Sequence, residues 1–150
     1  VRFLLQEDPQ FVVAEKGASG LGDGVEDSAM SVWTMPSGVM VYSHESFTHP
    51  FADNGLEIHG SAGSLYARDV MQEGPEGEIT LVTAEGRRQV SFDWVGAYET
   101  VVAAFERAAA DGGAPAASGV DGLKSLMVAD AVRQAAVTGK RQAPDYGDLA

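Results

Sequence analysis

Apolar and polar residues alternate over residues 26–35 and again over 38–47, with the short sequence Pro36-Ser37-Gly38 between them. A period of two residues is typical of β-strands, because successive side chains point to opposite faces of a sheet. Pro36 presets φ for the second position of a tight turn, and Gly38 follows two residues later. The pattern therefore predicts an antiparallel hairpin. Neither face of its first arm is wholly polar, so we expect both faces to be covered.

Further strand-like stretches lie on either side of this hairpin. They are residues 11–15, 55–60, 64–68, 78–83 and 88–92. Gly60 and Gly63 permit a tight reversal between two of these stretches. A glycine-rich loop is expected at 16–24, and a polar turn at 72–77.

The period changes near residue 97, where apolar side chains begin to recur at the spacing of one α-helical face. Gly112 and Gly113 end this helix, and its apolar stripe is expected to face a core. The stripe consists of Tyr98, Val101, Val102, Phe105 and Ala109. A second helix follows, with Ser118 or Asp121 as its cap and Gly139 as its stop. The side chains that run along its expected inner face are Leu123, Leu126, Met127, Ala131 and Gln134.

The two ends of the chain carry weaker signals. Residues 1–8 look like the last turns of an amphipathic helix that stops before Pro9 and has no capping residue at its start. Such an opening suggests a cut chain, and residues 142–150 are expected to form a loose tail. The whole pattern predicts one α+β domain, in which an open, mostly antiparallel β-sheet carries helices packed on one face.

Charge and composition exclude several classes of partner. The chain has 22 acidic and 10 basic residues, a formal net charge of -12, and no cluster of basic residues. This balance argues against binding to nucleic acid or to an anionic membrane. The chain has no cysteine, so it has no disulfide or thiolate chemistry. No apolar run approaches the roughly 20 residues that span a bilayer. The sequence predicts a cytoplasmic protein.

The residues that carry chemistry do not form a complete catalytic set. The glycine cluster at 17–24 lacks the G-x-G-x-x-G spacing and the following helix of a dinucleotide loop. His44, His49 and His59 have no helical i, i+4 pair, so structural or solvent-facing histidines are favoured over zinc ligands. His49 is kept as a candidate because the segment 47–54 is rich in aromatic residues, as in a pocket. No catalytic, cofactor or metal site is assigned from these residues.

Five segments are specific in their order and spacing. They are residues 26–30, 37–39, 56–65, 119–126 and 136–141. Together these segments resemble the C-terminal domain of the Gfo/Idh/MocA family, which contains the glucose-fructose oxidoreductases and inositol dehydrogenases. The resemblance covers nearly the whole chain, from Val1 to Arg141.

The resemblance implies an oxidoreductase that depends on NADP or NAD and acts on a sugar or polyol-like carbonyl or hydroxyl group. In such proteins an N-terminal Rossmann domain binds the cofactor and carries the catalytic lysine. That domain is absent from this chain. Residues 1–141 are then expected to be the C-terminal substrate and oligomerisation domain, with 142–150 as a tail. On this expectation the chain alone binds no cofactor and transfers no hydride.

The resemblance also implies which residues approach the sugar. In similar proteins these lie in the loop before residue 56 and in the segment that enters the helix at Tyr98. The candidate substrate-binding residues are therefore Phe47, His49, Phe51 and Trp94. Ordinary packing between the sheet and the helix remains open as the alternative for each of them.

The resemblance further implies a homo-oligomer, because similar proteins associate through this sheet. An alternative class of function is a free-standing, non-catalytic sheet module for protein-protein association. An uncovered apolar sheet face would favour symmetric dimerisation in such a module.

Overall fold

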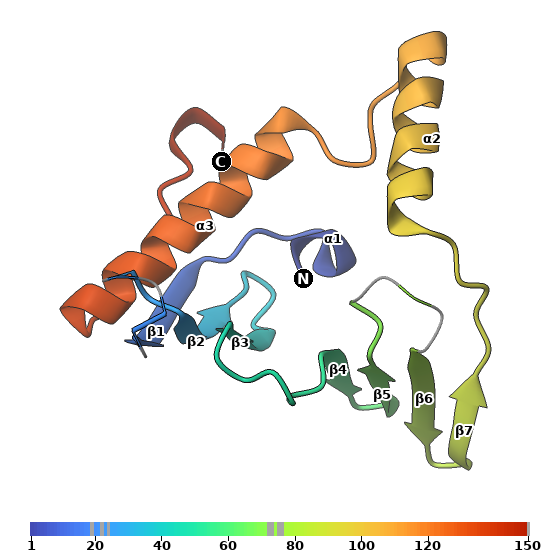
Figure 1. Cartoon of the computed structure of the whole chain (residues 1–150), viewed down its shortest axis with the longest axis horizontal. Helices are drawn as coiled ribbons and strands as arrows, with labels where there is room; N and C mark the ends of the chain where they lie inside the picture. The colour runs from blue at the N-terminus through green and yellow to red at the C-terminus, as the bar shows by residue number, and fades with distance from the viewer. Residues whose placement is uncertain (19, 22, 24, 72–73, 75–76, 150) are drawn as a thin grey trace. The chain divides into compact units, whose positions relative to one another are not determined.

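The computed structural model describes residues 1–18, 20–21, 23, 25–71, 74 and 77–149 of the chain. The chain forms two compact units, one made of Val1–Pro50 with Ala117–Ala150 and the other of Phe51–Ala116 (Figure 1). The sequence, by contrast, predicted a single domain. The predicted glycine-rich loop and polar turn lie partly outside the described residues.

The first unit contains a three-stranded antiparallel sheet in the order β1-β2-β3. Its strands are β1 (Phe11–Gly17), β2 (Ser28–Thr34) and β3 (Met40–Ser46). The predicted hairpin is confirmed. At its turn Met35 N–H donates to Val39 O at 2.9 Å, and Gly38 N–H donates to Met35 O at 2.9 Å. Gly38 has a φ of 87°, which a residue with a side chain rarely adopts.

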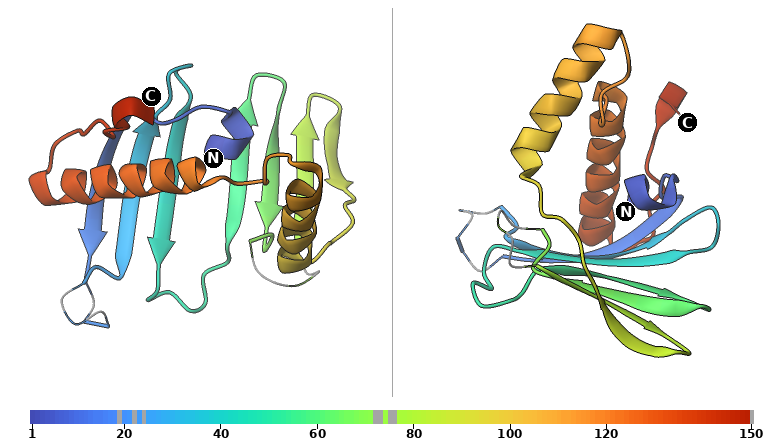
Figure 2. Two further views of the ribbon diagram at one scale, coloured as in Figure 1. Left: turned by 90° about the horizontal axis from the view of Figure 1, so that it is seen from above. Right: turned by 90° about the vertical axis from the view of Figure 1, so that its right-hand side faces the viewer.

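The helix α3 (Gly119–Thr138) covers one face of this sheet (Figures 1 and 2). Ala131 and Ala135 of the helix form a buried cluster with Val12 of β1, and Trp33 of β2 packs against it. The small alanine side chains let the helix lie close to the strand. This contact forms the core of the first unit.

The buried face of α3 agrees with the prediction at Ala131, which is buried, and differs from it at the two leucines. Leu123 is 45% exposed and Leu126 is 66% exposed, whereas Val128 and Ala135 are buried. Apolar residues are spread around this helix, so their spacing predicts a helix without selecting the face that meets the sheet. Packing against β1 selects the face with the smaller side chains.

Both ends of α3 are capped as predicted. Ser118 and Asp121 form a capping box, in which Asp121 N–H donates to Ser118 Oγ at 3.2 Å and Ser118 N–H donates to the Asp121 carboxylate at 2.8 Å. At the other end Gly139 has a φ of 63°, and its N–H donates to Ala135 O at 2.8 Å. Local sequence therefore defines where this helix begins and ends.

The segment after α3 is held against the first unit by hydrogen bonds. The sequence had predicted a loose tail there. Gln142 and Val12 exchange two backbone hydrogen bonds of 2.8 and 2.9 Å. Tyr146 Oη donates to Pro9 O at 2.9 Å, just before the 3-10 helix η1 (Gly147–Leu149). Residues 142–149 thus extend the first unit along β1.

The other face of this sheet, which we call the open face, is exposed. The sequence had predicted that both faces would be covered. It carries Val13, Met30, Val32, Met40 and Tyr42, each at least 41% exposed. Strand alternation and register place these side chains on the side opposite Val12. The open face is therefore an apolar surface in the described part of the first unit.

The second unit contains a four-stranded antiparallel sheet in the order β4-β5-β6-β7. Its strands are β4 (Gly55–Gly60), β5 (Gly63–Arg68), β6 (Glu78–Thr83) and β7 (Gly86–Val90). A Cβ atom at Gly63 would lie 2.5 Å from Val82 O, so the close approach of β5 to β6 needs a glycine there. The predicted strands are confirmed with small shifts in their ends.

The helix α2 (Ala97–Asp111) ends at Gly112, as the sequence predicted. Its predicted apolar stripe does not face a core among the described residues, because Tyr98, Val101, Val102 and Phe105 are each at least 56% exposed. The helical period is confirmed, and the expected burial of the stripe is corrected. Periodicity reports which residues share a face, whereas burial depends on what packs against that face.

Candidate functional site

Two of the predicted substrate-binding aromatics stand in solvent. Phe47 follows directly after β3 and is 87% exposed, and Phe51 is 98% exposed. The backbone at the entrance of this segment is held, because Phe47 N–H donates to Asp27 O at 2.9 Å. Among the described residues, neither ring is packed between the sheet and a helix, which was the alternative to substrate binding. Both are available for contact with a ligand.

His49 lies against a second histidine. Its ring is edge-on to the ring of His44 on β3, with ring centroids 5.6 Å apart and planes at 62°. The two residues are five positions apart, a spacing that matches neither a helical face nor a neighbouring strand pair. The pairing arises only because the chain turns back after β3, so the sequence offered no signal for it.

Trp94 lines a hollow in the second unit. The hollow has a volume of about 520 Å³, and its walls include Gln89, Val90 and Phe92 from β7 and the segment that follows it. Trp94 itself is 46% exposed. The lining of this hollow is mixed, because the polar side chains of Glu78, Ser91 and Asp93 also belong to it.

The four candidate residues are divided between the two units. Phe47 and His49 belong to the first unit, and Phe51 and Trp94 belong to the second. Their assembly into one substrate site therefore stays a prediction.

A polar network lies on β4 and β5 around His59, one of the histidines that the sequence predicted to be structural or solvent-facing. His59 Nδ1 is 3.0 Å from Ser64 Oγ, and His59 Nε2 is 3.3 Å from Glu57 Oε2. The His59 ring also meets Tyr66 edge-on, with centroids 5.5 Å apart. The His59 and Glu57 side chains are 57% and 61% exposed, so these contacts order a surface and do not exclude water from a reacting group.

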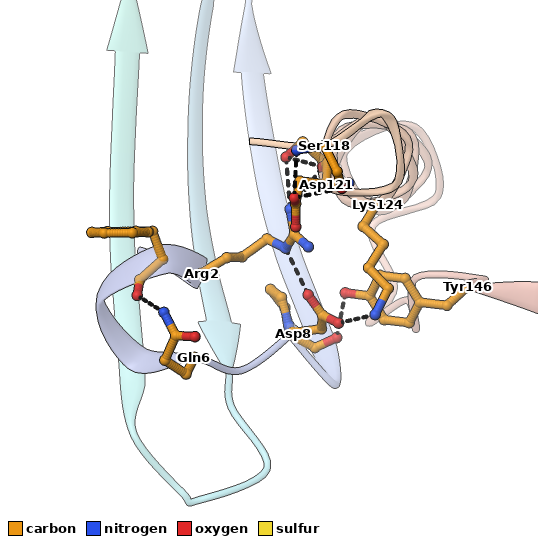
Figure 3. A network of polar contacts seen from close by, with 10 residues as sticks. Arg2, Gln6, Asp8, Ser118, Asp121, Lys124 and Tyr146 are labelled. Carbon is orange, nitrogen blue, oxygen red and sulfur yellow. Dashed lines mark hydrogen bonds and ion pairs between the residues drawn. The ribbon is translucent and has the colours of Figure 1, made fainter. Parts of the chain in front are cut away.

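A second polar network, which we call the N-terminal clasp, joins Arg2, Asp8, Lys124 and Tyr146 (Figure 3). Arg2 Nε and Lys124 Nζ both donate to the Asp8 carboxylate, at 2.7 and 2.6 Å. Arg2 Nη1 also donates to Ser125 Oγ at 2.8 Å. The clasp thereby ties α1 (Arg2–Leu5) and the segment before β1 to α3.

Burial and neighbouring charges shift the pKa values of Asp8 and Tyr146 in opposite directions. Burial raises the pKa of Asp8, but hydrogen bonds from Lys124 and Arg2 and their positive charges outweigh it and hold that pKa below its usual value. Burial raises the pKa of Tyr146 to about 12, with a smaller contribution from the charge of Asp8. Asp8 is therefore charged and Tyr146 neutral near neutral pH. A charged Asp8 accepts hydrogen bonds from Arg2 and Lys124, and a neutral Tyr146 can donate to Pro9 O.

The N-termini of the two long helices do not fit the phosphates of a dinucleotide. At α3 the Asp121 carboxylate occupies the first turn and accepts from Ser118 N–H. At α2 the Glu99 side chain lies beside the cap residue Gly96. Each helix end already holds a negative charge, which would repel a phosphate.

Across the part of the chain that the structure describes, no helix is both long and apolar enough to cross a membrane.

Comparison with known proteins identifies the sequence relationship. Residues 1–66 match the family described as the GFO/IDH/MocA C-terminal domain. The chain is 44% identical over 141 residues to a 1,5-anhydro-D-fructose reductase from Ensifer adhaerens. That match covers 93% of this chain and 42% of the relative, so the chain spans less than half of that reductase's length.

Solved structures share the fold. An aldose-aldose oxidoreductase from Caulobacter crescentus complexed with glycerol matches with a TM-score of 0.86 and 19% identity, over 95% of this chain and 43% of that one. An oxidoreductase from Agrobacterium radiobacter in complex with NAD+, L-tartaric acid and magnesium matches with a TM-score of 0.74 and 18% identity, over 95% of this chain and 45% of that one. The resemblance drawn from the sequence is confirmed: the chain carries a C-terminal domain of the Gfo/Idh/MocA oxidoreductase family.

Proposed function

We propose that this chain is the substrate-side domain of a nicotinamide-dependent reductase that acts on a sugar or polyol-like carbonyl group in the cytoplasm. The observation that carries the proposal is the 44% identity to a 1,5-anhydro-D-fructose reductase, which extends over 93% of the chain. The nicotinamide cofactor, NADP or NAD, supplies the hydride and binds outside this chain. The lack of fit at the α2 and α3 N-termini supports that division.

In this proposal the exposed aromatic residues bind and orient the sugar. The substrate-binding residues are Phe47, His49, Phe51 and Trp94. Aromatic faces offer apolar contact to the C–H groups of a sugar ring, and an imidazole offers a hydrogen bond to a hydroxyl. The exposure of Phe47 and Phe51, at 87% and 98%, supports this role because neither ring is used in a core of the described residues.

The test uses the full-length protein that contains this chain. Reduction of 1,5-anhydro-D-fructose and of related sugars is followed by the loss of absorbance of NADPH, with NADH in parallel. The expected result is turnover with at least one sugar-like carbonyl compound. The 150-residue chain alone is expected to leave the fluorescence of either cofactor unchanged. Absence of turnover with every sugar and polyol tested, under conditions where the full-length protein binds the cofactor, would contradict the proposed substrate class.

A second candidate function is an association module without catalysis. The observation that favours it is the open face, whose apolar side chains Val13, Met30, Val32, Met40 and Tyr42 are exposed. Burial of this face against a second copy would remove apolar area from water at about 25 cal/mol per Å². A homo-oligomer is expected under either function. A full-length protein that dimerises but neither binds NADPH or NADH nor reduces a sugar would favour the module.

A further inference from the structure

The chain contains three histidines, and the fold brings two of them together. The ring centroids of His44 and His49 are 5.6 Å apart, and the ring planes meet at 62°. Both residues belong to the first unit and both are exposed. The third histidine, His59, is in the second unit and is engaged by Ser64 and Glu57.

This separation suits two imidazoles that bind one metal ion. A bond from nitrogen to a divalent transition metal is about 2.0–2.1 Å long, so an ion in line with that nitrogen lies roughly 3 Å from the ring centre. Two rings at neighbouring tetrahedral positions then have centroids roughly 5 Å apart. The observed 5.6 Å between the two centroids is close to this separation.

The surroundings of the pair also suit a cation. Met30 is directly opposite His44 in the register of β2 and β3, on the open face, and its thioether is a soft neighbour for a transition metal. The net charge of the chain is -12, which raises the local concentration of cations. Within the described residues, no group of three or more histidine, aspartate or glutamate residues forms a metal site. Water would therefore complete the coordination.

We propose that His44 and His49 together bind one divalent transition-metal ion, such as Ni²⁺ or Zn²⁺. Imidazole is a preferred ligand of these ions, whereas Mg²⁺ and Ca²⁺ prefer oxygen. Because His44 is on β3 and His49 follows the end of that strand, an ion held by both rings ties the segment after β3 back to the strand. This site does not depend on the proposed reductase activity.

The experiment is a calorimetric titration of the protein with NiCl₂ and, separately, with ZnCl₂. The variants are His44→Gln, His49→Gln and the double variant, with His59→Gln as the matched control. We expect each single variant at the pair to weaken one metal site by at least about 10-fold, because removal of a ligand costs no less than removal of a group that orients it. The double variant should abolish the site. His59→Gln should bind as the unchanged protein does. Thermal unfolding in the presence of a chelator shows that each variant is folded.

Nuclear magnetic resonance of the imidazole protons gives a second measurement. Substoichiometric Ni²⁺ should broaden the His44 and His49 signals together and leave the His59 signal sharp. The proposal is overturned if the unchanged protein shows no site that the double variant lacks. It is also overturned if His59→Gln weakens binding as much as His44→Gln does, or if the two signals broaden at different metal concentrations.

Discussion

Asp8 and Lys124 are 116 residues apart in the sequence and form an ion pair with an Nζ–Oδ2 distance of 2.6 Å. Arg2 approaches the other carboxylate oxygen of Asp8 at 2.7 Å. The Arg2 and Lys124 side chains are only 17% and 18% exposed. One carboxylate therefore balances two partly buried cations, and the N-terminal clasp depends on it.

Replacement of this carboxylate should destabilise the protein. Asp8→Ala leaves two cations without their acceptor, and we expect it to lower the free energy of unfolding by about 1–3 kcal/mol. The measurement is urea-induced unfolding. Asp130→Ala is the matched control, because Asp130 pairs with Arg133 on an exposed part of α3 and should matter little. An equal effect of the two substitutions would contradict the importance of the clasp.

The clasp should also make stability depend on acid. The folded-state pKa of Asp8 lies below its usual value, so the folded state binds this proton less readily than the unfolded state does. The contribution to stability is fully present above the unfolded-state pKa of about 3.9 and is lost as the pH falls through the folded-state pKa. Melting temperatures between neutral pH and about pH 3 should fall less steeply in Asp8→Asn than in the unchanged protein. Parallel curves would show that Asp8 does not contribute in this range.

The exposed phenylalanines should affect sugar use and leave stability unchanged. Under the proposed function, Phe47→Ala and Phe51→Ala in the full-length protein are each expected to lower kcat/KM for the sugar by roughly 2- to 10-fold, because each removes an aromatic contact of about 0.5–1.5 kcal/mol. Cofactor affinity and melting temperature should stay near those of the unchanged enzyme. Leu126→Ala, at a side chain that is 66% exposed on α3, is the control.

The opposite outcome for these variants is also specific. A buried aromatic would cost roughly 3–5 kcal/mol of stability on truncation to alanine. A large fall in melting temperature with unchanged sugar kinetics would therefore assign the two rings to packing in the full-length protein and remove them from the substrate site.

The open face should mediate self-association. Val32→Lys places a charge at its centre, and we expect the dimer to dissociate at concentrations where the unchanged protein remains associated, since a buried unpaired charge is costly. Sedimentation velocity over a range of concentrations measures this. Val120→Lys, at an exposed position of α3, is the matched control. A monomer at every concentration of the unchanged protein would contradict the prediction.

Local sequence determined the parts of the fold that depend on neighbouring residues. The turn before β3 follows from Pro36 and Gly38, and the start of α3 follows from the Ser118 and Asp121 capping box. Alternation over two residues and recurrence over three or four are short-range patterns, so the strands and both long helices were predicted correctly. The ordered segments also identified the family.

Tertiary structure decided which surfaces meet. Ala135 of α3 is buried and Leu126 is exposed, although leucine is the more apolar residue, because helix packing against a strand favours a close fit over side-chain hydrophobicity. Tyr98 on α2 is exposed because a periodic apolar stripe does not specify which element packs against it.

The contacts between Asp8 and Lys124 and between His44 and His49 also depend on the fold. A charge or an imidazole has no periodic signal, and its partner is set by the path of the chain between the two positions. Sequence by itself therefore determined the elements and the family of this protein. The choice of buried face, the clasp and the histidine pair were decided by packing and chain reversal, which act between residues that local patterns do not connect.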